Sequence, residues 1–204
     1  MIYEMRTYDL KPGTVAQFED RFAEALPHRE KYSKLGAFWH TEFGPLNQVI
    51  HVWPYEDMQE RADVRAEAAK DPIWPPKTGD IVLNMLSDSL IPAPFMRPLG
   101  NQQLGNVYEM RTYTYRGGAL PEVIKRWSDA IPHREKYSPL AACWYTEFGP
   151  LNKWIHLWPY KDLTQRDRIR AEAFKDPNWP APTREFQVQQ ENKILIPAAF
   201  SPMR

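Results

Sequence analysis

The chain has 204 residues, and its 26 Lys and Arg are balanced by 26 Asp and Glu. Zero net charge gives no overall field that attracts nucleic acid or an anionic membrane surface, so we expect neither as a partner. A single cysteine, Cys143, excludes an internal disulfide, and no apolar run approaches the ~18 residues that span a bilayer. The first residues lack a basic segment followed by an apolar one, so we expect a cytoplasmic protein.

The sequence repeats itself. TyrGluMetArgThrTyr at 3–8 returns at 108–113, and ThrGluPheGlyProLeuAsn at 41–47 returns at 146–152. A period this long indicates a duplicated domain, because the units of solenoid proteins are roughly 20–50 residues long. We therefore predict one domain over residues 1–98, a Pro- and Gly-containing linker over 99–106, and a second domain over 107–204.

In the first copy, alternation of β-forming residues predicts a strand over 2–10. Apolar residues at helical spacing from Val15 to Leu26 predict an amphipathic helix. Pro27 is expected to interrupt or kink this helix, and the following PHREKYS segment is expected to continue it for a turn or two.

Aromatic and β-branched runs at 37–43 and 49–53 predict a hairpin with a four-residue loop. Asp57 stands three residues before Glu60, the spacing of a capping box, so a second helix is expected to begin there and to end near Lys70. A last strand is expected near 80–90. The order β-α-β-β-α-β predicts an α+β, ferredoxin-like fold, with the helix-free sheet faces of the two copies packed together in one chain as a sandwich or barrel.

The segments YEMRTYDLKPG, PHREKYSKLGAFWHTEFGPLN and IHVWPYED resemble the NIPSNAP family of the dimeric α+β barrel superfamily, and the resemblance covers both copies. It implies two tandem ferredoxin-like domains that pair as an intrachain barrel. It implies no general reaction, since some animal members resemble scaffold proteins. Neighbouring families include cofactor-independent monooxygenases, dehydratases, isomerases and haem-degrading enzymes, so the resemblance leaves haem binding open.

The first strand places Glu4, Arg6 and Tyr8 on one face. One interpretation is a solvated or ion-paired structural face. The alternative is a face that lines the barrel interior, where Arg holds an oxyanion and Tyr orients a substrate. In the latter case the histidine of the neighbouring strand, His51, would move protons, although a lone histidine on an apolar face is more often a structural core residue.

The candidate catalytic residues are therefore Arg6, Tyr8, His51, Arg111, Tyr113 and His156. The candidate ligand-binding residues are acidic groups and aromatic walls, each with a structural alternative in packing or turn stabilisation: Glu4, Trp39, Glu42, Trp53, Glu109, Trp144, Glu147 and Trp158. No nucleotide, zinc or serine-hydrolase motif is found, so no metal or cofactor is expected, while a metal bound by scattered His and Glu stays open.

Two functions from different classes follow. The first is a small-molecule binder or cofactor-independent oxidoreductase or isomerase, acting on an apolar or aromatic, acidic ligand. The alternative is a non-catalytic interaction or scaffold module, which an exposed apolar patch without a cavity would favour. We also expect the pseudo-dimeric chains to associate as a homo-oligomer.

Overall fold

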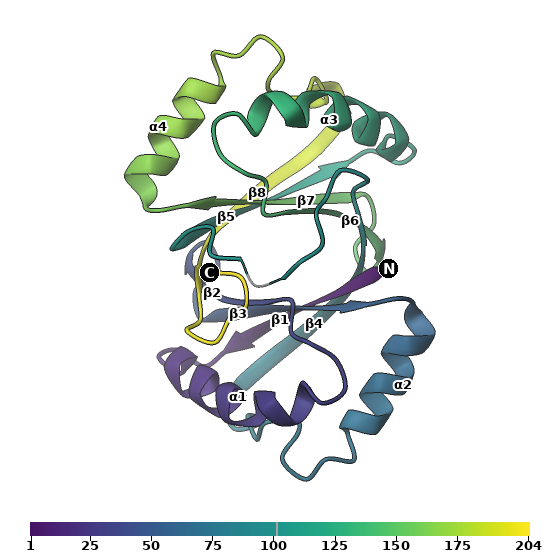
Figure 1. The fold of residues 1–204 in the computed structure, drawn as a ribbon, viewed down its shortest axis with the longest axis vertical. Helices are drawn as coiled ribbons and strands as arrows, with labels where there is room; N and C mark the ends of the chain where they lie inside the picture. Colours follow the sequence, from purple (N-terminus) through teal and green to yellow (C-terminus); the bar gives the residue numbers. More distant parts are fainter. Residues whose placement is uncertain (101) are drawn as a thin grey trace.

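The computed structural model describes residues 1–100 and 102–204, in which eight strands close into one antiparallel barrel with four helices outside it (Figure 1). The first copy contains β1 (Ile2–Leu10), α1 (Val15–Arg29), β2 (Ala37–Phe43), β3 (Gln48–Tyr55), α2 (Met58–Ala68) and β4 (Val82–Pro92). The second contains β5 (Val107–Tyr115), α3 (Leu120–Arg134), β6 (Ala142–Phe148), β7 (Lys153–Tyr160), α4 (Leu163–Ala173), a short 3-10 helix η1 (Arg184–Phe186) and β8 (Gln187–Pro197). The predicted element order is confirmed.

Local sequence explains where the helices begin and end. Helix α1 buries Phe18 and Phe22 and continues through Pro27 to its end, so the proline lies inside the helix. Helix α2 begins at Asp57, whose side chain accepts a hydrogen bond from the backbone N–H of Glu60 at 2.8 Å. The predicted N-terminal cap is therefore present.

The barrel joins the two copies through their last strands. Its strand order is β1-β3-β2-β8-β5-β7-β6-β4. Strand β4 of the first copy pairs with β6 of the second, and β8 pairs with β2 in the corresponding way. Neither copy closes a sheet alone, and the cyclic arrangement leaves no whole strand at an edge.

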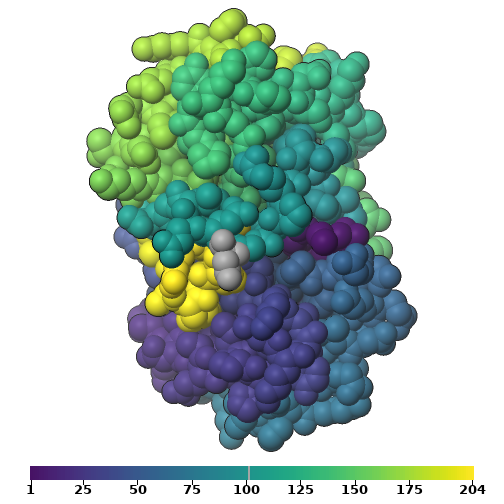
Figure 2. Space-filling model, viewed as in Figure 1, coloured from purple at the N-terminus to yellow at the C-terminus, as the bar shows by residue number. Residues whose placement is uncertain are grey.

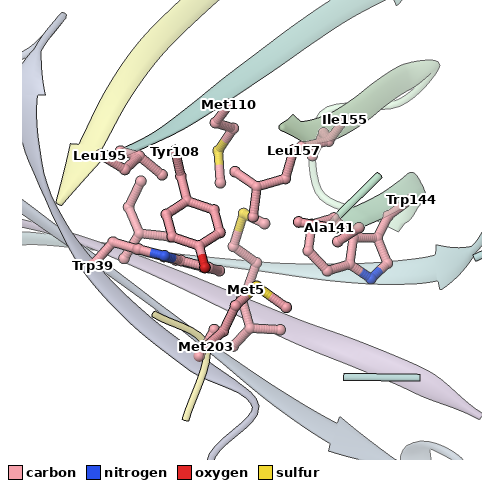
Figure 3. Packing of buried hydrophobic residues seen from close by; sticks show 14 of the residues in the cluster. Met5, Trp39, Tyr108, Met110, Ala141, Trp144, Ile155, Leu157, Leu195 and Met203 are labelled. Carbon is pink, nitrogen blue, oxygen red and sulfur yellow. The ribbon is translucent and has the colours of Figure 1, made fainter. Parts of the chain in front are cut away.

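Strand alternation divides the side chains between the barrel interior and the helix-covered outer layer. Tyr3 and Met5 belong to a shared interior core with their counterparts Tyr108 and Met110. Figure 3 shows Met5, Tyr108 and Met110 in this core. Arg6 lies opposite His51 in the register of β1 and β3, on the other face of the sheet. The interpretation that the polar face lines the barrel interior is therefore wrong, because that space is filled by apolar side chains.

The segments that follow β4 and β8 cross to the opposite copy. Ala93 donates its N–H to the carbonyl of Cys143, and Ala198 donates to the carbonyl of Phe38. The side chain of Phe200 stacks on Phe22 of α1, with ring centroids 5.6 Å apart. Figure 2 shows this yellow C-terminal segment seated on the purple and blue first copy. The two halves thus exchange arms as well as strands.

The predicted linker over 99–106 includes residue 101, which lies outside the described residues. After this position, Gln102 forms a parallel bridge with Met203, and Leu104 donates its N–H to the carbonyl of Arg204. The linker and the C-terminus therefore run side by side. Among the residues described, no helix is long and apolar enough to cross a membrane.

Candidate functional site

A cavity of about 340 Å³ lies between the outer face of the sheet and the helices of the first copy. Its walls combine three arginines and one histidine with aromatic rings and prolines. The lining residues that matter most below are Arg6, Tyr8, Phe22, Arg29, His51, Trp53, Arg65, Ala69 and Trp74. Aromatic walls with a few convergent polar groups are typical of small-molecule sites.

Strand β1 fixes the position of Arg6. Its guanidinium donates through Nε to the hydroxyl of Tyr8 and through Nη1 to Oε1 of Glu4, the latter at 2.8 Å. All three side chains leave the same face of the strand at successive alternate positions, which makes these contacts local. The expected Glu–Arg pair is present, and it holds Arg6 at the cavity wall.

Glu4 does not line the cavity but forms ion pairs with several arginines around it. It is buried and accepts hydrogen bonds from Arg61 and Ser87, each at 2.7 Å, while Arg65 approaches it at 3.7 Å. Burial alone would raise the pKa of Glu4, but Arg61, Ser87 and Arg65 hold it at about 2. Glu4 is therefore ionised at neutral pH.

His51 is buried, with 2 % of its surface exposed, and one of its nitrogens has a partner. Trp53 donates its indole N–H to Nδ1 of His51 at 2.7 Å. Because an indole nitrogen can only donate, Nδ1 must be the unprotonated nitrogen and the neutral ring carries its hydrogen on Nε2. Burial and then the charge of Arg6 lower the pKa of His51 to about 3, so the ring is neutral.

The Nε2 atom of His51 is buried and has no hydrogen-bond partner among the described residues. A buried donor without a partner is costly, and such groups are rare in folded proteins. A residue that lines the cavity therefore carries one buried N–H without a partner among the described residues. With its lone pair on Nδ1 occupied by Trp53, the arrangement fits a hydrogen-bond donor better than the expected proton carrier.

Arg29, at the end of α1, is a buried cation with 3 % of its surface exposed. It donates to the hydroxyls of Ser33 and Tyr55, both at 2.8 Å, and lies over the ring of Trp53 at 4.4 Å. No carboxylate of the described residues lies within 4 Å of it. Burial lowers the pKa of Arg29, yet guanidinium groups remain charged in proteins.

The second copy repeats this chemistry residue by residue. Trp158 donates to Nδ1 of His156 at 2.7 Å, and Nε2 of His156 is again unpartnered among the described residues. Arg134 lies over Trp158 at 4.2 Å and donates to Tyr160. The cavity beside these groups, however, has a volume of only about 50 Å³.

Four of the predicted ligand-binding residues lie elsewhere. Trp39 and Trp144 are fully buried in the barrel interior, because they occupy the inward-facing positions of β2 and β6 (Figure 3). Glu42 and Glu147 are exposed at the ends of these strands, beside the hairpin loops. None of the four lines the cavity of the first copy or its counterpart in the second.

Arg29 and Arg65 line the cavity but were not predicted from the sequence as site residues. A signal for Arg29 was present in the PHREKYS motif, which is identical in both copies. The basic and acidic residues of this motif are typical of a helix surface, and its neighbour His28 does lie near the surface, where it pairs with Asp71 at 3.0 Å. Only the packing of α1 on Trp53 distinguishes the buried arginine from its exposed neighbours.

The closed barrel formed by two ferredoxin-like halves, with a helix-covered cleft on each side, defines a dimeric α+β barrel fused into one chain. The NIPSNAP family model matches residues 3–97 and again residues 108–202. The chain belongs to the NIPSNAP family.

Curated relatives extend over the whole chain. The chain is 30% identical to "Protein NipSnap homolog 3A" of Homo sapiens over 217 residues, which cover 100% of this chain and 86% of the relative. It is 32% identical to "Protein NipSnap homolog" of Dictyostelium discoideum, with coverage of 96% and 87%. A solved structure from Fusobacterium nucleatum, described as a candidate monooxygenase, covers 97% of this chain with a TM-score of 0.68 at 13% identity, which shows a shared fold.

Proposed function

We propose that this protein binds a small molecule with an acidic group and an apolar or aromatic body, in the cleft between sheet and helices of the first copy. The observation that carries the proposal is Arg29, a buried cation that faces the cavity without a carboxylate partner among the described residues. Buried charges are normally paired. An anionic ligand would provide the missing partner.

The charge around the cleft supports an anion. Arg6, Arg29 and Arg65 line the cavity, and Glu4 is the acidic group that pairs with two of them from behind. The charge of the groups that line the cavity is therefore net positive. Guanidinium groups bind carboxylates through two parallel hydrogen bonds, which gives orientation as well as affinity.

The remaining walls support an apolar body for the ligand. Tyr8, Phe22, Trp53 and Trp74 present their rings to the cavity, and prolines complete the wall. The rings of Phe22 and Trp74 meet edge to face at 5.5 Å, so they form a stiff corner. Such a wall favours a flat ligand over a flexible polar one.

The donors suit an oxyanion. Arg29 and the Nε2–H of His51 both offer hydrogen bonds, and the cavity lining contains no aspartate or glutamate that could act as a base. This arrangement would hold a carboxylate, or an enolate formed from a ligand. Cofactor-independent oxidation or isomerisation remains the predicted class of chemistry, by analogy of fold.

A pair of matched variants tests the binding proposal. Replacing Arg29 with Met in the first copy should weaken binding of 2-naphthoate at least tenfold, because the charged partner is lost. Arg134→Met makes the same change at the equivalent position of the second copy and serves as the control. Isothermal titration calorimetry measures both, and native mass spectrometry of the purified protein reports retained small molecules and assembly mass.

Stability should be measured beside affinity. Arg29→Met removes a buried charge together with the hydrogen bonds to Ser33 and Tyr55, and Arg134→Met removes the same contacts in the second copy. The two variants should therefore shift the melting temperature by similar amounts, so that a difference in affinity reports the ligand and not the fold. Binding that survives Arg29→Met unaltered would contradict the proposal. Absence of any binding by the wild-type chain, together with capture of a protein partner, would favour the scaffold alternative.

A further inference from the structure

The two cavities differ in volume although several of their polar residues recur. Arginine, tyrosine and histidine recur at matching positions, yet the first cavity has about 340 Å³ and the second about 50 Å³. The volume therefore depends on lining positions that differ between the copies. Gly79, Val82 and Met85 of the first cavity correspond to Arg184, Gln187 and Gln190, and two further differences add aromatic rings.

One difference lies on the first helix of each copy. Phe22 of α1 is replaced by Trp127 in α3, and both side chains are buried. The centroid of the Phe22 ring lies 5.2 Å from that of His51, whereas the Trp127 ring lies 4.6 Å from His156. The larger indole thus occupies space in front of the histidine.

A second difference lies at the end of the other helix. Ala69 follows α2 and lines the open cavity, while its counterpart Phe174 follows α4 and lines the small one. The guanidinium of Arg170 lies over the Phe174 ring at 5.6 Å. Phe174 therefore places an aromatic ring where the first copy has a methyl group.

Other replacements do not reopen the second cleft. Cys143 is smaller than its counterpart Phe38, but the neighbouring position changes from Val49 to Trp154, which is buried. The rings of Trp127 and Trp154 pack with centroids 5.5 Å apart. The space left by the smaller side chain of Cys143 is thus offset by the larger side chain of Trp154 on the neighbouring strand.

We infer that the chain binds one planar aromatic carboxylate, in the first copy, and that Phe174 and Trp127 close the equivalent cleft of the second. This inference rests on the proposed function and adds its stoichiometry, its ligand shape and the residues that decide between the copies. A cavity of this size is at the small end for organic ligands, which limits the ligand to roughly one or two rings.

Exchange of the deciding residues provides the test. Wild-type protein titrated with 2-naphthoate should show one site per chain by calorimetry and one retained molecule by native mass spectrometry. Ala69→Phe should abolish that site or weaken it at least tenfold. Ala69 is exposed, so the larger ring can be accommodated without disturbing the core.

The complementary variant should open the closed cleft. The double change Trp127→Phe and Phe174→Ala should raise the stoichiometry from one to two. If the double variant fails to fold, Phe174→Ala alone is measured, since this side chain is 55% exposed and its loss leaves the core intact. Ala66→Phe is the control, because Ala66 is exposed on the same helix as Arg65 and does not line the cavity.

The outcomes separate the inference from the function on which it rests. Two sites in the wild type, or one site that persists unchanged in Ala69→Phe, would overturn the inference and leave ligand binding intact. A wild type and variants that all fail to bind 2-naphthoate at millimolar concentration would overturn both. Loss of binding in Ala66→Phe as well would show that Ala69→Phe acts through the helix and not through the cleft.

Discussion

His51 is a buried histidine with one hydrogen-bonded ring nitrogen and one ring nitrogen that has no partner in the described part of the chain. One nitrogen is satisfied by Trp53 and the other is an unpartnered donor among the described residues. Its pKa is lowered to about 3, and the pKa of His156 is lowered well below its ordinary value by burial. Both rings are therefore neutral in the folded chain and become charged in the unfolded chain below pH ~6.5.

The stability of the protein should consequently fall in mild acid. A histidine whose folded pKa is depressed stabilises the fold above its unfolded pKa, and the contribution is lost as the pH falls from ~6.5 toward the folded value. Each such histidine should lower the free energy of unfolding by up to about 1.4 kcal/mol per pH unit in that range. Urea denaturation at pH 7, 6 and 5 measures the slope.

The variant His51→Asn removes one of the two titrating groups. It should reduce the acid-side slope by about half, whatever its effect on stability at pH 7. An unchanged slope would mean that His51 is protonated in the folded chain, contrary to its surroundings.

Sequence alternation could place Arg6 and His51 on one sheet face, because the period of a strand is fixed by its backbone. It could not decide which side of the sheet faced the barrel interior, since both faces carry bulky side chains. Arg29 was harder to find. A helical arginine beside glutamate and lysine has a surface pattern, and its burial depends on residues such as Trp53 that are distant in sequence.

Helix α2 is held to the sheet mainly by charge. Ala68 is its one buried residue, whereas Arg61 and Arg65 of the same helix both point to the buried carboxylate of Glu4. Helices normally attach through an apolar stripe. Here the ion pairs of Glu4 on β1 with these two arginines provide attachment that an apolar stripe normally gives.

Glu4→Gln should therefore loosen α2 specifically. The neutral amide keeps the shape but removes the charge that pairs with the arginines, at a cost of about 3 kcal/mol. Amide hydrogen exchange should become faster over residues 58–68 and remain slow in the barrel strands. Glu109→Gln is the matched control and should have the same effect on α4 while leaving α2 unchanged.

The elements themselves were largely predictable, since the capping residue Asp57 and the strand patterns act locally. Closure of the barrel was less predictable from the sequence. Whether the two sheets form a sandwich or a barrel depends on whether β4 and β8 pair with strands of the other copy. Nothing in the period of these strands encodes the identity of their neighbours, because pairing across copies joins residues far apart in sequence.

The whole molecule is one cooperative unit as a result of this crossing. Each copy contributes a strand and the segment after it to the packing of the other copy, so a destabilising substitution in one half should also destabilise the other half. Phe200 belongs to the second copy but packs on Phe22 and Phe38 of the first, and Phe95 packs on Trp154 in the opposite direction.

Phe200→Ala should lower stability by about 3 kcal/mol and accelerate hydrogen exchange in α1, which lies in the other half of the sequence. Phe95→Ala should act instead on α3. Exchange that accelerated only within the half carrying the substitution would contradict the crossed packing. The mass measured for each variant also tests the predicted association of chains into a homo-oligomer.

The crossed arms also set an order of events during synthesis. A ribosome that has made the first hundred residues has supplied α1 and its aromatic face, but not the ring of Phe200 that stacks on that face. This ring emerges only after β8 has been made. The apolar side of the first half therefore stays uncovered until the segment after β8 is synthesised, and a shortened chain reaching only the linker should seek the same cover from another copy of itself.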